Sequence, residues 1–190
     1  NALGVDPETG IYQFEDYNID GNISSLEDRQ WVEDFAPKFY GGFGNTFSYG
    51  NLTLDMFFQF KKQKAFNELT FAATPGYRGN APVSLLDRWQ QPGDTNPIQM
   101  ASGGLAFGED TGVLQQRSNA AVSDASFIRL RNISLNYKVP TTDSNLEVNV
   151  YLQGQNLLTF TNYSGPDPEQ PSSTRLPPLR QLTLGLQVAF

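Results

Sequence analysis

The chain has 190 residues, no cysteine and no histidine, and a net charge of −7 from 20 acidic and 13 basic residues. It therefore has no thiolate or imidazole metal site, no cysteine nucleophile and no catalytic triad that uses histidine as its base. The acidic balance also argues against nucleic acid as a partner, because phosphate binding requires a basic surface.

Phenylalanine, glycine and proline are abundant, with 14, 17 and 12 copies, and this mixture favours β-structure with many turns. No apolar run approaches the length of a membrane helix. The first residues lack the basic and apolar regions of a signal peptide. We expect either a mature protein or a piece of a larger one.

Residues 1–37 are polar and rich in turn formers, which predicts a long loop. Within it, "EDYNIDGNISSLEDR" spaces oxygen-bearing side chains as an EF-hand calcium loop does, with Gly21 at the sharp turn. The candidate ligands are Asp16, Asn18, Asp20, Asn22 through its backbone carbonyl, and Glu27, with Asp28 as the alternative to Glu27. An EF-hand also needs flanking helices, and no helical pattern precedes this loop. A Ca²⁺ site and a metal-free polar turn both remain open.

Residues 38–61 predict an antiparallel hairpin around a two-residue turn at Gly50 and Asn51. Side chains alternate with a period of two, so each strand has an apolar and a more polar face. In the second strand the apolar set is Leu52, Leu54, Met56, Phe58 and Phe60, and the other set is Thr53, Asp55, Phe57, Gln59 and Lys61.

Residues 62–126 show no sustained period and contain many glycines and prolines, which predicts a very long loop. A short helix is expected at about Pro82–Trp89, with the proline near its first turn. Tyr77, Arg88 and Trp89 lie in this segment. They are candidates for contact with a ligand or with a partner protein, and loop packing is the alternative for each of them.

A second hairpin is expected at residues 127–155, with strands at 127–139 and 146–155. In its first strand the apolar phase slips between Leu130 and Ile133, which either a β-bulge or an inward apolar contact would explain. A long loop follows, and the last strand alternates to a terminal phenylalanine. The remaining segments are the loop 156–178 and the strand 179–190.

The connections between the five strands alternate between short and long. A compact domain rarely holds a structureless loop of about 60 residues. A transmembrane β-barrel has short turns at one end, long loops at the other, and strands of about 9–11 residues. We therefore expect an all-β fold in which five antiparallel strands form the C-terminal part of a large barrel, with extracellular loops and periplasmic turns. Five strands cannot close a lipid-facing barrel alone.

Aromatic side chains near the predicted strand ends suit the interfacial girdle of such a barrel. They are Tyr40, Tyr49, Tyr137, Tyr151 and Phe160. No catalytic constellation is present. Asp55 and Glu147 lie on predicted lumen faces, where nothing fixes their separation, so we expect no enzyme activity.

Three stretches carry a family resemblance: "RLRNISLNY", "GQNLLTFTNYSGPDPE" and the "NIDG" loop. With the segments around them they resemble, in order, the C-terminal region of SusC/RagA-type TonB-dependent outer-membrane transporters. Two features depart from the family pattern. The acidic loop more usually ends in Asp, where Glu27 and Asp28 both stand here, and "LPPLRQ" replaces the tyrosine often found before the last strand.

The resemblance implies a barrel of about 22 strands with a plugged lumen in the outer membrane of a Gram-negative cell. Such a transporter imports oligosaccharides or peptides with a SusD-like surface lipoprotein, using energy passed by TonB. The plug and the segment that contacts TonB would lie upstream of Asn1. Two alternatives remain: a soluble, calcium-stabilised β-sandwich that binds carbohydrate, and a SusC-like scaffold subunit of a surface assembly.

Overall fold

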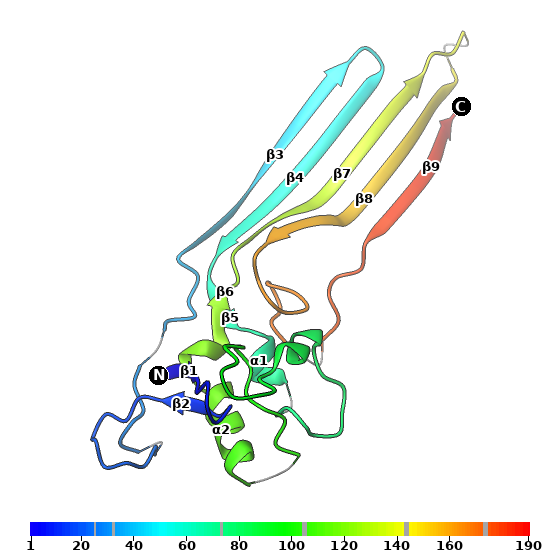
Figure 1. Ribbon diagram of the computed structural model, residues 1–190. Helices are drawn as coiled ribbons and strands as arrows, with labels where there is room; N and C mark the ends of the chain where they lie inside the picture. The colour runs from blue at the N-terminus through cyan, green and yellow to red at the C-terminus, as the bar shows by residue number, and fades with distance from the viewer. Residues whose placement is uncertain (25, 32, 73, 104–105, 143–144, 173–174) are drawn as a thin grey trace.

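The long strands form one extended sheet, and most of the remaining chain gathers at one end of it (Figure 1). The structure is a computed structural model that describes residues 1–24, 26–31, 33–72, 74–103, 106–142, 145–172 and 175–190, with the backbone alone at 106–109. No helix in these ranges is long and apolar enough to cross a membrane.

Five strands form the main sheet, and their order in the sheet follows their order in the sequence. They are β3 (Phe39–Tyr49), β4 (Leu52–Lys62), β7 (Phe127–Val139), β8 (Glu147–Thr161) and β9 (Gln181–Ala189). Every neighbouring pair is antiparallel. This arrangement confirms the five predicted strands, although β8 continues beyond its predicted end at residue 155.

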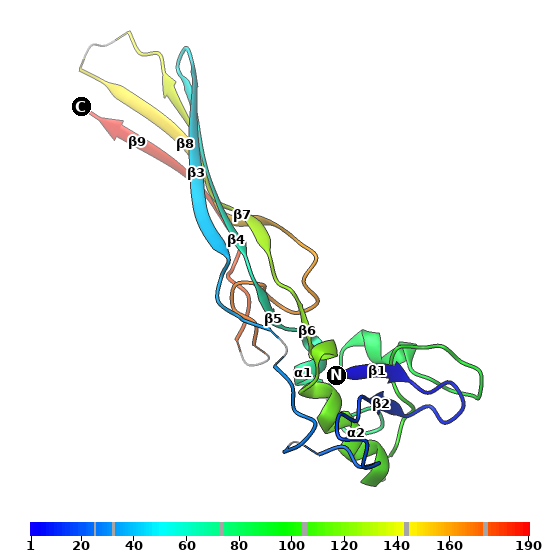
Figure 2. The ribbon, with the colours of Figure 1, turned by 90° about the vertical axis from the view of Figure 1, so that its left-hand side faces the viewer.

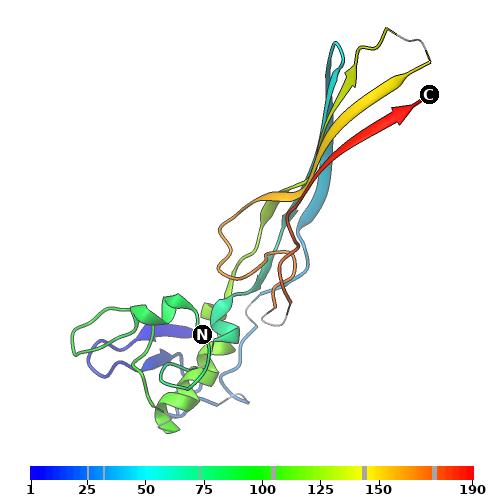
Figure 3. The same ribbon diagram turned by 90° about the vertical axis from the view of Figure 1, so that its right-hand side faces the viewer.

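The two ends of the sheet differ in their connections. At the tight-turn end, β3 and β4 join through Gly50 and Asn51, and Gly50 has a φ of 56°, which a glycine adopts without strain. The β7–β8 connection and the C-terminus lie at this end too (Figure 1). At the opposite, loop end, the described residues within 1–37 and 63–126 gather in a loop lobe (Figures 2 and 3).

Cross-strand pairing keeps most side chains on each face alike in character, with exceptions such as Asn45 on the apolar face and Phe57 and Tyr151 on the polar face. Phe43, Phe58 and Leu130 pair in sequence across β3, β4 and β7, whereas Gln59 pairs with Arg129 on the other side. The apolar face includes Phe47, Leu54, Met56, Phe60, Ile128, Ile133, Leu135, Leu152, Leu158, Leu184, Leu186 and Val188. The polar face includes Thr46, Ser48, Thr53, Asp55, Ser134, Asn136, Gln153, Thr159, Thr183 and Gln187.

A bulge in β7 explains the slip in its apolar phase. Pairing with β4 passes directly from Leu130 to Asn132, so Arg131 is the extra residue. The pairing of β8 with β7 is irregular at the same level, where Asn156 has a φ of 52°. The bulge confirms the prediction, and it places the two apolar stretches of β7 on one face of the sheet.

The loop lobe contains regular structure where the sequence predicted loops and a single short helix. Its elements are β1 (Ala2–Val5), β2 (Tyr12–Phe14), β5 (Lys64–Phe66), α1 (Glu68–Phe71), η1 (Val83–Asp87), α2 (Ala106–Gln116), η2 (Asn119–Ala121) and β6 (Val122–Asp124). The helix expected at Pro82–Trp89 is the shorter 3-10 helix η1. The prediction of irregular loops at 1–37 and 62–126 was therefore wrong in part.

A small apolar core lies where the loop lobe meets the sheet. Ala65 of β5 and Ala125, which follows β6, pack with Tyr163, which follows β8. The Tyr163 hydroxyl donates to the Phe66 carbonyl at 2.5 Å, which satisfies its polar group, and burial raises the pKa of Tyr163. This contact ties the start of the β8–β9 connection to the loop lobe.

Candidate functional site

Four charged side chains form a cluster on the polar face near the loop end, here called the arginine–carboxylate cluster: Arg129, Arg131, Asp167 and Glu169. Arg129 projects from β7 and is 1% exposed. Its Nη2 donates to Asp167 Oδ2 at 2.6 Å, and its Nη1 donates to Glu169 Oε2 at 3.0 Å. Its Nε donates to the Thr159 hydroxyl at 3.0 Å, so all three guanidinium nitrogens have partners.

The bulge residue Arg131 completes the cluster. Its Nη2 donates to both Glu169 oxygens at 2.6 and 2.7 Å, a two-oxygen contact that fixes the carboxylate plane. Its Nη1 donates to Asn156 Oδ1 at 3.1 Å, and its Nε donates to Gln59 Oε1 at 2.5 Å. The two irregular strands thus supply the side chains that hold the β8–β9 connection.

The cluster holds the β8–β9 connection against the polar face of the sheet. Asp167 Oδ1 also accepts backbone N–H groups of Glu169 and Gln170, so the same carboxylate shapes its own loop. Gln63, which follows β4, reinforces the contact by donating to the Pro168 carbonyl at 2.6 Å. Because buried charges are stable only with partners, these ion pairs determine where residues 166–170 lie.

The sequence analysis did not identify this cluster. Arg129 and Arg131 have the same parity in "FIRLRN", which looks like an ordinary polar strand face. Their carboxylate partners lie 38 residues away in a proline-rich loop, and no local pattern joins the two segments. The one available signal was the slip of apolar phase at this point in β7.

The acidic loop adopts the turn geometry that its sequence indicates. Both oxygens of Asp16 accept backbone N–H groups, from Ile19 and from Gly21, at 2.8 Å. Asp20 accepts the N–H of Asn22 at 2.7 Å. Ile19 and Gly21 both have positive φ, of 58° and 81°, which curls the chain tightly around the Asp16 carboxylate.

Glu27 and Asp28, the two candidates for the last ligand, have different surroundings. The Asn18 amide nitrogen contacts Glu27 Oε2 at 3.1 Å and Asp20 Oδ2 at 2.9 Å, so Glu27 faces the other candidate ligands. Asp28 is 6% exposed and accepts the backbone N–H groups of Ser24 at 2.7 Å and Tyr17 at 2.8 Å. These bonds lower the pKa of Asp28. Asp28 thus stabilises the folded loop through hydrogen bonds to the loop's own backbone.

The donor set fits Ca²⁺ by chemistry, because carboxylate and amide oxygens are its preferred ligands. Within the described ranges, however, no three or more carboxylates come close enough together to form a metal site. The Asn18 amide nitrogen lies between Asp20 and Glu27 as their shared donor. The Ca²⁺ site therefore stays a prediction, with Glu27 as the better placed last ligand.

The three loop residues proposed for ligand contact differ in exposure. Trp89 is 9% exposed; its indole donates to the Pro7 carbonyl at 2.9 Å, and its ring packs on Gly10, where an added Cβ would lie 2.4 Å from it. Arg88 is half-buried, and its backbone pairs with that of Ile98 in an isolated parallel β-bridge. Tyr77 is 44% exposed. Trp89 has the geometry of loop packing.

No family model matches the chain. Similar curated proteins are the TonB-dependent receptors P3 and P26 of Formosa agariphila. The chain is 29% identical to P3 over 209 residues and 30% identical to P26 over 212 residues, and each match covers the whole chain. The chain spans 20% and 21% of their respective lengths, about a fifth of each relative.

Solved structures of the RagAB peptide importer in its open-open state and of the RagAB peptide transporter have the same fold. Each matches the whole chain with a TM-score of 0.75 and 24% sequence identity, and the match covers 22% of that structure's chain. The sheet with two distinct faces is thus a segment of a TonB-dependent receptor barrel. Over its whole length the chain is similar to a fifth of these TonB-dependent receptors, and its fold matches the C-terminal region of a SusC/RagA-type protein.

Proposed function

We propose that the chain is part of the wall of an outer-membrane importer, with its apolar face toward lipid and its polar face toward the lumen. The observation that carries this proposal is the separation of side chains across the five-stranded sheet. Leu182, Leu184 and Leu186 of β9 are 69%, 75% and 64% exposed on one side. The arginine–carboxylate cluster lies on the other side.

The cost of charge in lipid determines which face points outward. An Arg or Lys on the lipid face of a barrel costs about 2–4 kcal/mol at the bilayer midplane, whereas lumen positions tolerate charge. Arg129 and Asp55 share the polar face, and the apolar face carries leucine, isoleucine and phenylalanine at the corresponding levels. Only one orientation of the sheet avoids these costs.

The proposal extends to the whole receptor. We infer that it imports oligosaccharides or peptides with energy from TonB through an upstream plug region, and that a SusD-like surface lipoprotein works with it. The relatives named as TonB-dependent receptors support the energy source, and the likeness to a peptide importer favours peptides over oligosaccharides as cargo. In this proposal the loop lobe faces the cell exterior.

The β-sandwich alternative conflicts with the fold. A sandwich covers the apolar face of one sheet with a second sheet about 10 Å away. Within the described ranges the only further sheets are the pairs β1–β2 and β5–β6, and the apolar face of the five-stranded sheet stays exposed. The scaffold alternative keeps the barrel and differs only in whether cargo crosses it.

Uptake by cells tests the proposal against the scaffold alternative. A strain that lacks the receptor gene, and the same strain complemented with the full-length gene, would be given labelled oligopeptides or labelled oligosaccharides of matched size. We expect receptor-dependent uptake of one class, abolished by deletion of TonB. Equal uptake in both strains for both classes, with the receptor present in the outer membrane, would support the scaffold alternative.

A further inference from the structure

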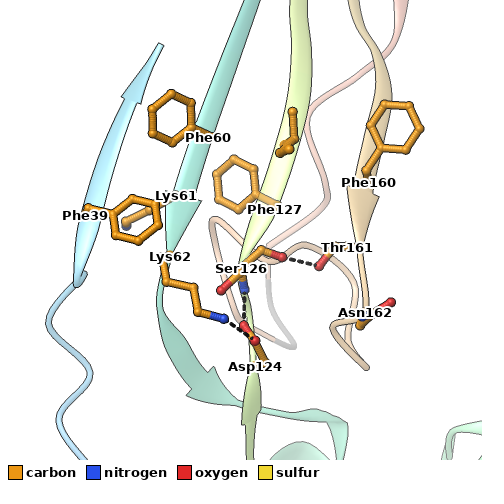
Figure 4. A pocket seen from close by; sticks show the side chains of 11 residues that line it. Phe39, Phe60, Lys61, Lys62, Asp124, Ser126, Phe127, Phe160, Thr161 and Asn162 are labelled. Atoms are coloured by element: carbon orange, nitrogen blue, oxygen red, sulfur yellow. Dashed lines mark hydrogen bonds and ion pairs between the residues drawn. The ribbon is translucent and has the colours of Figure 1, made fainter.

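The apolar face has a hollow at its loop end, where β3, β4, β7 and β8 enter the loops. Its volume is about 450 Å³. Phenylalanines line the part toward the middle of the sheet, and polar side chains line the part toward the loop lobe (Figure 4). A lining divided in this way suits a ligand with an apolar and a polar part.

Most apolar side chains of the lining are exposed, whereas Phe127 is buried and Phe60 is half-buried. Phe39 and Phe160 are each 59% exposed, and Ile128 is 46% exposed. Phe60 packs edge to face against Phe39, with ring centroids 6.3 Å apart. These side chains continue the apolar face that the proposed function places against lipid.

The polar part is built around an ion pair. Lys62, the last residue of β4, donates from Nζ to Asp124 Oδ2 at 2.6 Å, and the Ser126 backbone donates to Asp124 Oδ1 at 2.8 Å. Together they lower the pKa of Asp124 to about 2, so the pair stays charged at neutral pH. Because side chains alternate along a strand, Lys62 lies on the same face as Phe60.

Positive charge is concentrated at this end of the β3–β4 hairpin. Four of the five lysines of an otherwise acidic chain occur here: Lys38, Lys61, Lys62 and Lys64. The Lys38 backbone donates to the Lys62 carbonyl at 2.9 Å, which holds the two segments together. Asp124 and Glu33 offset part of this charge through Lys62 and Lys64. The remaining lysine, Lys138, lies at the tight-turn end.

We propose that this hollow binds a phosphate-bearing lipid headgroup, with the acyl chain against the phenylalanines and the phosphate at Lys62. The proposal rests on the proposed function, because the lipid must adjoin the apolar face. Lysines at the border of an apolar band attract anionic headgroups, and their methylene stems can lie along the apolar surface. Asp124 then holds Lys62 at the border and competes with the phosphate for it.

The test uses the full-length receptor in uncharged detergent, mixed with phosphatidic acid or with phosphatidylcholine of the same acyl chains. Native mass spectrometry counts the bound lipid. We expect Lys62→Gln to weaken phosphatidic acid binding by about fivefold. Lys138→Gln, which removes a lysine paired with Glu147 at 3.0 Å at the other end of the sheet, is the matched control and should have no effect.

Asp124→Asn distinguishes recognition of a headgroup phosphate from recognition of a headgroup cation. It should strengthen phosphatidic acid binding, because it removes the carboxylate that competes with the phosphate. The proposal is overturned if Lys62→Gln leaves this binding unchanged. It is also overturned if Asp124→Asn weakens binding of phosphatidylcholine, which would indicate recognition of a headgroup cation. A receptor that stays monomeric and folded without detergent would instead contradict the proposed membrane function.

Discussion

Arg129 Nη2 and Asp167 Oδ2 lie 2.6 Å apart on the polar face of the sheet. The two side chains are only 2% and 6% exposed, respectively. One belongs to β7 and the other to the loop before β9. A buried ion pair of this kind contributes little net stability compared with apolar replacements, but the loss of one partner is costly. Its role here is to hold the β8–β9 connection against the sheet. The loss of one partner should therefore have a large effect on stability.

Asp167→Ala should destabilise the receptor by about 3–5 kcal/mol, because it leaves part of the buried Arg129 charge unpaired. The denaturation midpoint of the full-length receptor in detergent measures this loss. Lys138→Gln breaks an ion pair whose side chains are both 58% exposed, and it should cost less than about 1 kcal/mol.

The double variant Arg129→Met with Asp167→Leu should recover much of the stability lost in Asp167→Ala. Glu169 keeps Arg131 as its partner in this variant, so no buried charge is left alone. If the loss of stability in the double variant equals the sum of the losses in Arg129→Met and Asp167→Leu alone, the two residues do not act as a pair.

Gly185→Ala should destabilise β9 on its polar face. A Cβ at Gly185 would lie 2.1 Å from the Tyr151 ring of the neighbouring strand, so the ring or the strand would have to move, at a cost of about 1–3 kcal/mol. Gly44→Ala is the matched control, because the nearest atom to its Cβ would be at an ordinary 3.6 Å. Equal denaturation midpoints for the two variants would contradict the packing described.

Calcium should bind the acidic loop if its donor spacing is functional. Calorimetric titration of the receptor with Ca²⁺ should show a binding event that Asp20→Ala abolishes. Glu8→Ala, at an exposed carboxylate outside the loop, should leave it unchanged. The absence of any Ca²⁺-dependent heat would leave the loop as a metal-free Asx turn.

Acid should open the same loop through Asp28. Its pKa is lower in the folded state than the usual 3.8, so its stabilising effect is complete above that value and is lost as the pH falls through the lower folded value. Hydrogen exchange should show the Tyr17 and Ser24 amides protected at pH 5 and exposed well below pH 3.8. Asp28→Asn should expose both amides at neutral pH as well.

The sheet could be predicted because its signals are local. A period of two with short turns sets the strands and faces, and the slip near Leu130 marks the bulge at Arg131. The longer β8 was missed because Asn156, with its positive φ, breaks the alternation within the strand.

The loop lobe could not be predicted because its order depends on tertiary contacts. Helix α2 contains glycines that lower helix propensity, and Gly112 is needed there because a Cβ would lie 2.4 Å from the Thr74 hydroxyl oxygen. Gln116 donates to the Ala72 carbonyl at 2.7 Å, another contact that no local pattern shows. The arginine–carboxylate cluster was missed for the same reason.

The orientation of the two faces of β9 tests the central claim most directly. The chain has no cysteine, so spin labels could be attached at single cysteines replacing Thr183, Leu184, Leu186 and Gln187 in a receptor freed of any other cysteine and placed in lipid bilayers. Labels at Leu184 and Leu186 should be relaxed by oxygen, which is concentrated in lipid. Labels at Thr183 and Gln187 should be relaxed by a water-soluble nickel chelate. Equal access of the chelate to all four positions would contradict a lipid-facing sheet.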